Sequence, residues 1–194
     1  MEVDSMVEIF RRSVERFAVK YTNYIGDGDS KTYSAIVNAA PYGNSININK
    51  KKCVRHVQKR IDSRLRALKN KSLVGRNKLT GKIIDNLSIY YGLAIRRNCE
   101  SKDKMKTAIW ATFYHYSSTD EKPHHENCPE GSDSWQRAKV DGIPLTPTST
   151  IMSLLHDVLE AIRPIYDDLK KDTLLERCVG GFTQNNNESF NNII

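Results

Sequence analysis

The sequence lacks a long apolar run. No stretch approaches the roughly 18 consecutive apolar residues that cross a bilayer. The first residues, MEVDSMVEIFRR, include acids and no uninterrupted apolar segment, so we expect no secretory signal peptide. Both absences favour an intracellular protein with no membrane partner.

Cysteine is also scarce. The four cysteines are spread along the 194 residues without the spacing of a disulfide framework, which agrees with a reducing compartment. The length allows one domain with a hydrophobic core and is short for two.

Acidic residues are nearly missing between residues 50 and 78. This stretch holds one acid, Asp62, and twelve lysines or arginines, so its net charge is +11. The remainder holds 18 basic and 22 acidic residues, a net charge of −4, and the whole chain carries +7. A localised basic face is typical of a surface that binds a polyanion. The alternative is an ordinary solvated helix face.

The spacing of apolar residues predicts a largely helical chain with two short strands. Strands are expected over 21–25 and 45–49. Helices are predicted over 3–21, 30–39, 53–68, 81–97, 101–116, 150–163 and 165–177. The first is expected to pack the apolar stripe Val3, Val7, Phe10, Val14, Phe17 and Tyr21, and the third has Val54, Val57, Ile61, Leu65 and Leu68 on one face. Pro164 separates the last two, because proline lacks the N–H that continues a helix. Residues 117–149 are polar and without a period, so we expect a long irregular loop there.

Asp27 follows the first predicted strand and precedes a helix, within Gly26-Asp27-Gly28-Asp29. Open α/β sheets bind their ligands at this end of a strand. Carboxylates gathered there can hold divalent metals for phosphoryl transfer. A solvent-exposed turn is the alternative interpretation.

Cys53 and His56 are three residues apart in a predicted helix, which places them on one face. Both are side chains that bind zinc, but a structural zinc site has four ligands. His125 and Cys128 of the predicted loop are the candidates to complete such a site. The alternative is a buried cysteine near a histidine that binds no metal.

Glu188 follows three asparagines near the end of the sequence. Asparagine is a good helix cap, so Glu188 is expected in or near the first turn of a helix. The helix dipole there favours the charged carboxylate, as a metal ligand requires. Simple helix capping is the alternative.

Six segments together resemble the Mutator-like transposases, especially their Phantom-like group. In chain order they are GDGDSKTYSAI (26–36), CVRHVQKR (53–60), LTGKIIDNLSIYYGLAIRRN (79–98), AIWATFYH (108–115), HENCPEGSDSW (125–135) and GGFTQNNNESFN (180–191). Their order and spacing are more specific than any one segment, and they extend over nearly the whole chain.

The resemblance implies an α/β fold, namely part of an RNase H-like catalytic domain with an incomplete sheet. Residues 1–50 would form the strand-helix core, 51–179 a mostly helical insertion, and 180–194 the start of the last helix. In the family's DDE triad, Asp27 matches the second aspartate and Glu188 the glutamate. Cys53 and His56 match the family's C-x-x-H pair. The segment that carries the first aspartate has no counterpart in this sequence.

The function that the resemblance implies is metal-dependent cutting and joining of transposon DNA in the nucleus. Asp27 and Glu188 would be ligands of Mg²⁺ or Mn²⁺, and Zn²⁺ is a further candidate for the Cys/His pair. The expected partner is DNA, with no small-molecule substrate, and a homo-oligomer could supply the missing segment. DNA contacts are expected from the basic stretch, at Lys52, Arg55, Lys59, Arg60, Arg66 and Lys69.

Because the first aspartate is missing, we expect the chain alone to be inactive as a transposase. The alternative function is that of a non-catalytic DNA-binding or assembly remnant of a transposase.

Overall fold

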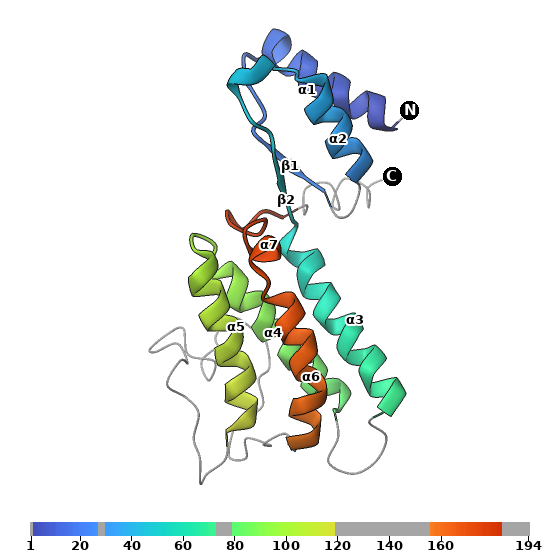
Figure 1. The fold of residues 1–194 in the computed structure, drawn as a ribbon, viewed down its shortest axis with the longest axis vertical. Helices are drawn as coiled ribbons and strands as arrows, with labels where there is room; N and C mark the ends of the chain where they lie inside the picture. The colour runs from blue at the N-terminus through green and yellow to red at the C-terminus, as the bar shows by residue number, and fades with distance from the viewer. Residues whose placement is uncertain (1, 27–29, 73–78, 119–155, 184–194) are drawn as a thin grey trace. The chain divides into compact units, whose positions relative to one another are not determined.

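The computed structural model describes residues 2–26, 30–72, 79–118 and 156–183 (Figure 1). The chain divides into two compact units. The first comprises the residues up to Cys53 together with the segment from Phe182, and the second comprises Val54–Gly181. The second unit is therefore inserted into the sequence of the first.

The first unit is an α/β arrangement built on two parallel strands (Figure 1). Asn23 is in register with Asn49, and Ile25 with Lys51. Parallel strands need a crossover connection, and a helix supplies it here. The elements in chain order are α1 (Glu2–Phe17), β1 (Asn23–Ile25), α2 (Ser30–Ala39), the 3-10 helix η1 (Gly43–Ser45) and β2 (Asn49–Lys51).

The core of the first unit is small and is tied together by buried hydroxyl groups. Its buried apolar residues are Phe10, Ile36, Tyr42 and Ile48. The Tyr42 hydroxyl lies 2.8 Å from Ser13 Oγ and accepts a hydrogen bond from the Tyr21 backbone N–H at 2.9 Å. These bonds attach the turn between α1 and β1 to the segment that follows α2.

The second predicted strand was misplaced. It was expected over 45–49, whereas β2 begins at Asn49. The carbonyl of Ile48 accepts a hydrogen bond from the Tyr33 hydroxyl at 2.9 Å. The start of the predicted strand lies in the 3-10 helix η1 (Gly43–Ser45), and the strand ladder begins only at Asn49, whose N–H bonds the carbonyl of Thr22 at 2.8 Å.

The apolar stripe predicted along the first helix is buried only in its first half. Phe10 is buried, with Met6 and Val7 packed beside it against the core with α2. Val14 and Phe17 keep 43% and 64% of their surface exposed, so the expectation that the whole stripe packs was wrong within the described residues. The helix also ends at Phe17 and not at residue 21, because the next residue has a positive φ of 53°.

The second unit is a helical bundle (Figure 1). Neighbours in sequence pack together, α3 on α4 and α4 on α5, and α6 packs on both α3 and α5. The shared core includes Ile61, Leu87, Tyr91, Ile109 and Tyr166. The helices are α3 (Val54–Ser72), α4 (Gly81–Arg96), α5 (Lys102–Ser117), α6 (His156–Leu169) and the short α7 (Asp172–Leu175).

Hydroxyl side chains explain where two of these helices begin. Thr80 accepts a hydrogen bond from the Ile83 N–H, and Ser101 accepts one from the Lys104 N–H. Each side chain satisfies a backbone donor that has no partner inside its helix. The predicted starts at 81 and 101 agree with α4 and α5 to within one residue.

The predicted helix end before Pro164 was wrong, because α6 runs through this proline to Leu169. Proline inside a helix costs about 3 kcal/mol through the lost hydrogen bond and the ring clash. The buried stripe of α6 continues on both sides of it, with Val158 and Ile162 before and Tyr166 and Leu169 after. Burial of these side chains offsets that cost.

Over the described residues, the secondary structure is mostly helical with one two-stranded parallel sheet, which is loosely consistent with the expected α/β class. Among the described residues, no helix has both the length and the apolar character that crossing a membrane requires.

Candidate nucleic-acid interface

Helix α3 carries the central part of the basic stretch and is anchored by an apolar stripe of its surface. Val54, Val57, Ile61 and Leu65 are fully buried in the core of the second unit, as their spacing predicted. Because these four positions face inward, the basic residues between them are directed to the helix sides and to solvent.

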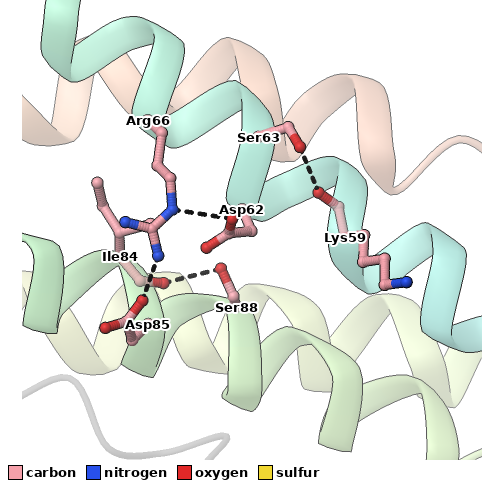
Figure 2. A network of polar contacts seen from close by, with 7 residues as sticks. All are labelled: Lys59, Asp62, Ser63, Arg66, Ile84, Asp85 and Ser88. Atoms are coloured by element: carbon pink, nitrogen blue, oxygen red, sulfur yellow. Dashed lines mark hydrogen bonds and ion pairs between the residues drawn. The ribbon is translucent and has the colours of Figure 1, made fainter.

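Two arginines of α3 are neutralised by carboxylates. Figure 2 shows Arg66 between Asp62 on its own helix and Asp85 on α4. Its Nε donates to Asp62 at 2.9 Å and its Nη2 donates to Asp85 at 2.5 Å. These hydrogen bonds raise the pKa of Arg66 above its ordinary value. Arg66 therefore joins α3 to α4, and its donors are directed at protein carboxylates.

Arg64 has a similar role on the side of α3 that faces α6. Its Nη1 pairs with Asp168, which also pairs with Lys171. Hydrogen bonds from Lys171 and Arg64 lower the pKa of Asp168 to about 2. The charge of Arg64 is thus balanced inside the helical unit.

The other predicted DNA contacts of the basic stretch differ in exposure. Lys52 keeps only 6% of its surface and is not part of an exposed face. Arg55 and Lys59 are exposed, whereas Arg60 and Lys69 are half-buried. Within the described part of the chain, Lys59 and Lys69 form no ion pair with a carboxylate. Their charges are therefore available to an external anion.

A groove of about 440 Å³ runs between α3 and α4. It is lined by Arg55, Gln58 and Lys59 from α3 and by Ser88 and Ile89 from α4, with Asp62 and Asp85 also in its lining. In Figure 2 the Lys59 side chain extends away from the Arg66 network along α3. The groove is thus acidic toward Asp85 and basic toward Arg55.

Sequence reasoning missed one cation next to this groove. Arg96, near the end of α4, donates a hydrogen bond from Nη1 to Gln58 Oε1 at 2.7 Å. The two residues are 38 positions apart, so no local spacing pairs them. The signal in the sequence is Gly92 inside a helix, since a glycine there often marks a close approach of another chain segment.

The predicted catalytic acids, Asp27 and Glu188, lie outside the described residues, as do His125 and Cys128. In sequence, Asp27 directly follows Gly26, the first residue after β1. The Gly26 N–H bonds the Lys51 carbonyl at 3.3 Å, and a Cβ at this glycine would lie 2.4 Å from the Tyr24 ring. A side chain would not fit at position 26, which explains the glycine before the aspartate.

The described residues do not form a zinc site by themselves. Cys53 is fully buried and directly precedes α3, and His56 lies in the first turn of that helix. No group of three or more His, Cys, Asp or Glu side chains suited to a metal occurs in the described ranges. Two ligands fall short of the four in a structural zinc site. The zinc prediction therefore depends on His125 and Cys128.

A comparison with known protein families identifies the family of this chain. Residues 1–135, well over half of the 194, match the family model described as Mutator-like transposase. The chain belongs to the Mutator-like transposase family. No curated protein and no solved structure matches it.

The match extends over the first unit up to Cys53 and over the first three helices of the second unit. It includes the parallel strand pair and the three helices α3, α4 and α5 that carry the groove and its cations. Transposases act on DNA, so the exposed basic side of α3 in this member of the family is a candidate DNA contact.

Proposed function

We propose that this chain is a transposase-derived DNA-binding protein that contacts the phosphate backbone through the exposed basic side of α3. The observation that carries the proposal is the division of charge on this helix. Arg64 and Arg66 are balanced by carboxylates, whereas Lys59 and Lys69 have no carboxylate partner among the described residues. Such cations bind phosphates without reading the base sequence.

The finer assignment extends the family match. We infer that the chain is the C-terminal part of a DDE catalytic domain of the Phantom-like group, with an RNase H-like fold. Support comes from the parallel pair β1 and β2 around α2, followed by a helical unit inserted before Phe182. Asp27 and Glu188 would hold Mg²⁺ or Mn²⁺, which supplies the Lewis acid for phosphoryl transfer in a complete enzyme. Its place of action would be the nucleus.

This proposal includes binding without cleavage by the chain alone. A two-metal centre is held by several carboxylates, and the first aspartate of the triad has no counterpart in the sequence. The competing function is a non-catalytic assembly remnant, which would keep the helical unit and lose the DNA contact.

The test is a salt titration of DNA binding. A labelled duplex is titrated with protein at KCl concentrations from about 50 to 200 mM, and the slope of log affinity against log salt is measured. Replacing Lys59 and Lys69 with glutamine should reduce the steepness of that slope by about 2, since each phosphate contact contributes about 0.9.

The matched control replaces Arg64 and Arg66 with glutamine, which removes the same charge from the same helix. Because these arginines already bind carboxylates, the slope should change by less than half as much as in the lysine variant. Equal effects of the two double variants would place the DNA surface elsewhere. An absence of wild-type binding at the lowest salt would reject the DNA-binding function itself.

A further inference from the structure

Arg96 is held in place from the neighbouring helix. Gln58 on α3 accepts its Nη1 hydrogen bond at 2.7 Å. The Gln58 amide fits there because position 92 is a glycine: a Cβ on Gly92 would lie 2.3 Å from Gln58 Oε1. The close approach of α3 and α4 at Gly92 therefore orients the guanidinium of Arg96.

The partner of Arg96 is neutral, in contrast to the partners of Arg64 and Arg66. Within the described residues no carboxylate pairs with Arg96, and the next residue is another arginine. Partial desolvation, and then the charge of Arg97, lower the pKa of Arg96 below its ordinary value, while its side chain stays exposed to solvent. A cation in these surroundings is stabilised by an anion from outside the chain.

The guanidinium of Arg96 has further N–H donors that can bind such an anion. A guanidinium has five N–H donors in a planar fork, and the hydrogen bond to Gln58 uses one of them. Lys59 follows Gln58 in sequence, lines the groove and forms no ion pair with a described carboxylate. Asp62 and Asp85, farther along the groove, repel anions and confine such a site to the Gln58 end.

We propose that Arg96, positioned by Gln58 and accompanied by Lys59, forms a phosphate-binding subsite across the α3–α4 crossing. Its ligand is a backbone phosphate of DNA, which a guanidinium binds through two parallel N–H···O bonds. This inference rests on the proposed DNA-binding function and adds a defined contact from a second helix. Arg96 would bind the phosphate, and Gln58 is a positioning residue.

The experiment compares three variants that each lower the net charge by one. They are Arg96→Gln, Gln58→Glu and the control Arg64→Gln. The full chain is titrated with the same labelled duplex and the same salt range as above. Arg96→Gln should reduce the slope by about 0.9 and weaken binding several-fold at about 100 mM salt. The Arg64→Gln control should weaken binding less than half as much.

Gln58→Glu separates a phosphate site from a purely structural contact. Glutamate can still accept the Arg96 hydrogen bond, so helix packing and thermal stability should be kept. The new carboxylate would neutralise Arg96 and occupy it, and DNA binding should fall to the level of Arg96→Gln. Gln58→Glu binding DNA as the wild type does would overturn the subsite.

The outcomes also separate this inference from the proposed function. If the wild type binds DNA and Arg96→Gln behaves like Arg64→Gln, the subsite is rejected while the α3 contact stands. If the wild type does not bind DNA at low salt, the proposed function is rejected. Circular dichroism of each variant establishes that a loss of binding is not a loss of fold.

Discussion

The hydroxyl of Tyr91 on α4 donates a hydrogen bond to the backbone carbonyl of Leu169, the last residue of α6, at 2.9 Å. Tyr91 is fully buried, and the two residues are 78 positions apart in the chain. The bond satisfies a carbonyl at a helix end that has no partner inside the helix. It therefore fixes the end of α6 against the middle of the bundle.

Tyr91→Phe should destabilise the helical unit by about 1–2 kcal/mol. The change removes one buried hydrogen bond and leaves the Leu169 carbonyl without that donor. Urea unfolding followed by circular dichroism measures the loss. The exposed Tyr114, on α5 of the same unit, provides the control Tyr114→Phe, which should shift the midpoint much less. Equal shifts would contradict the role given to Tyr91.

Stability should fall at alkaline pH. Burial raises the pKa of Tyr91, Tyr116 and Tyr166 above the ordinary tyrosine value near 10. The folded state then keeps protons that the unfolded state releases, so this stability is present below about pH 10 and is lost as pH rises toward the folded pKa values.

The loss should reach about 1.4 kcal/mol per pH unit for each tyrosine that stays protonated only in the folded state. Urea unfolding at about pH 9 and pH 11 measures it. Tyr91→Phe should reduce this pH dependence by the contribution of one tyrosine, about 1.4 kcal/mol per pH unit. A free energy of unfolding that is the same at both pH values would contradict the buried state of these hydroxyls.

Glycine should stabilise the ends of both helices in the first unit. The residues after α1 and α2, Ala18 and Ala40, have positive φ values of 53° and 39°. This conformation is costly for any residue with a Cβ. Ala18→Gly and Ala40→Gly should each add about 0.5–1 kcal/mol to the free energy of unfolding. The control Ala35→Gly inside α2 should lose about 1 kcal/mol. Thermal unfolding measures all three, and the same sign for all would contradict the prediction.

Gly92→Ala should weaken DNA binding while changing the stability of the fold only slightly. The new Cβ would displace the Gln58 amide and so break its hydrogen bond to Arg96. Alanine gains about 1 kcal/mol of helix propensity over glycine, which offsets most of the cost. Unfolding should change by less than about 1 kcal/mol, while DNA affinity falls to that of Arg96→Gln. Unchanged affinity would mean that Arg96 needs no orientation by Gln58.

Removing the proposed catalytic acids should not weaken DNA binding. Asp27→Asn and Glu188→Gln remove carboxylates whose proposed partner is a metal and not a phosphate. Both variants should bind duplex DNA within about twofold of the wild type, because phosphate contacts by cations dominate the affinity. Anisotropy titration without divalent ions is the measurement. A strong gain in affinity would show that these acids lie beside the bound DNA.

Local patterns in the sequence predicted most of the helices. The stripe of Val57, Ile61 and Leu65 was read from spacing alone, and α3 buries all three. The helix end predicted before Pro164 was wrong, because the local effect of the proline is outweighed by the buried stripe of α6 that continues beyond it. The strand at 45–49 was misplaced because the 3-10 helix η1 extends to Ser45 and the chain pairs with β1 only from Asn49. Tertiary contacts decide both cases.

The candidate site was predicted in its charge but not in its geometry. The excess of lysine and arginine on α3 is visible in the sequence, whereas the pairing of Arg66 with Asp85 depends on how α4 packs. The same packing brings Gln58 to Arg96. Neither pair lies at the spacing of three or four residues that brings side chains together on one helix. Only the fold therefore shows which cations already have a partner within the protein. The acids Asp27 and Glu188 lie outside the described residues and stay predictions.

The insertion of the helical unit into the first unit has a consequence for synthesis on the ribosome. Lys51 Nζ lies 5.9 Å from the centre of the Phe182 ring, so this contact joins residues 131 positions apart within the first unit. At about 5–20 residues per second, the ribosome needs on the order of ten seconds to make the intervening chain. Helical bundles fold within about milliseconds. The helices of the inserted bundle are therefore all synthesised before Phe182 exists, and the unit that begins first is the last to be completed.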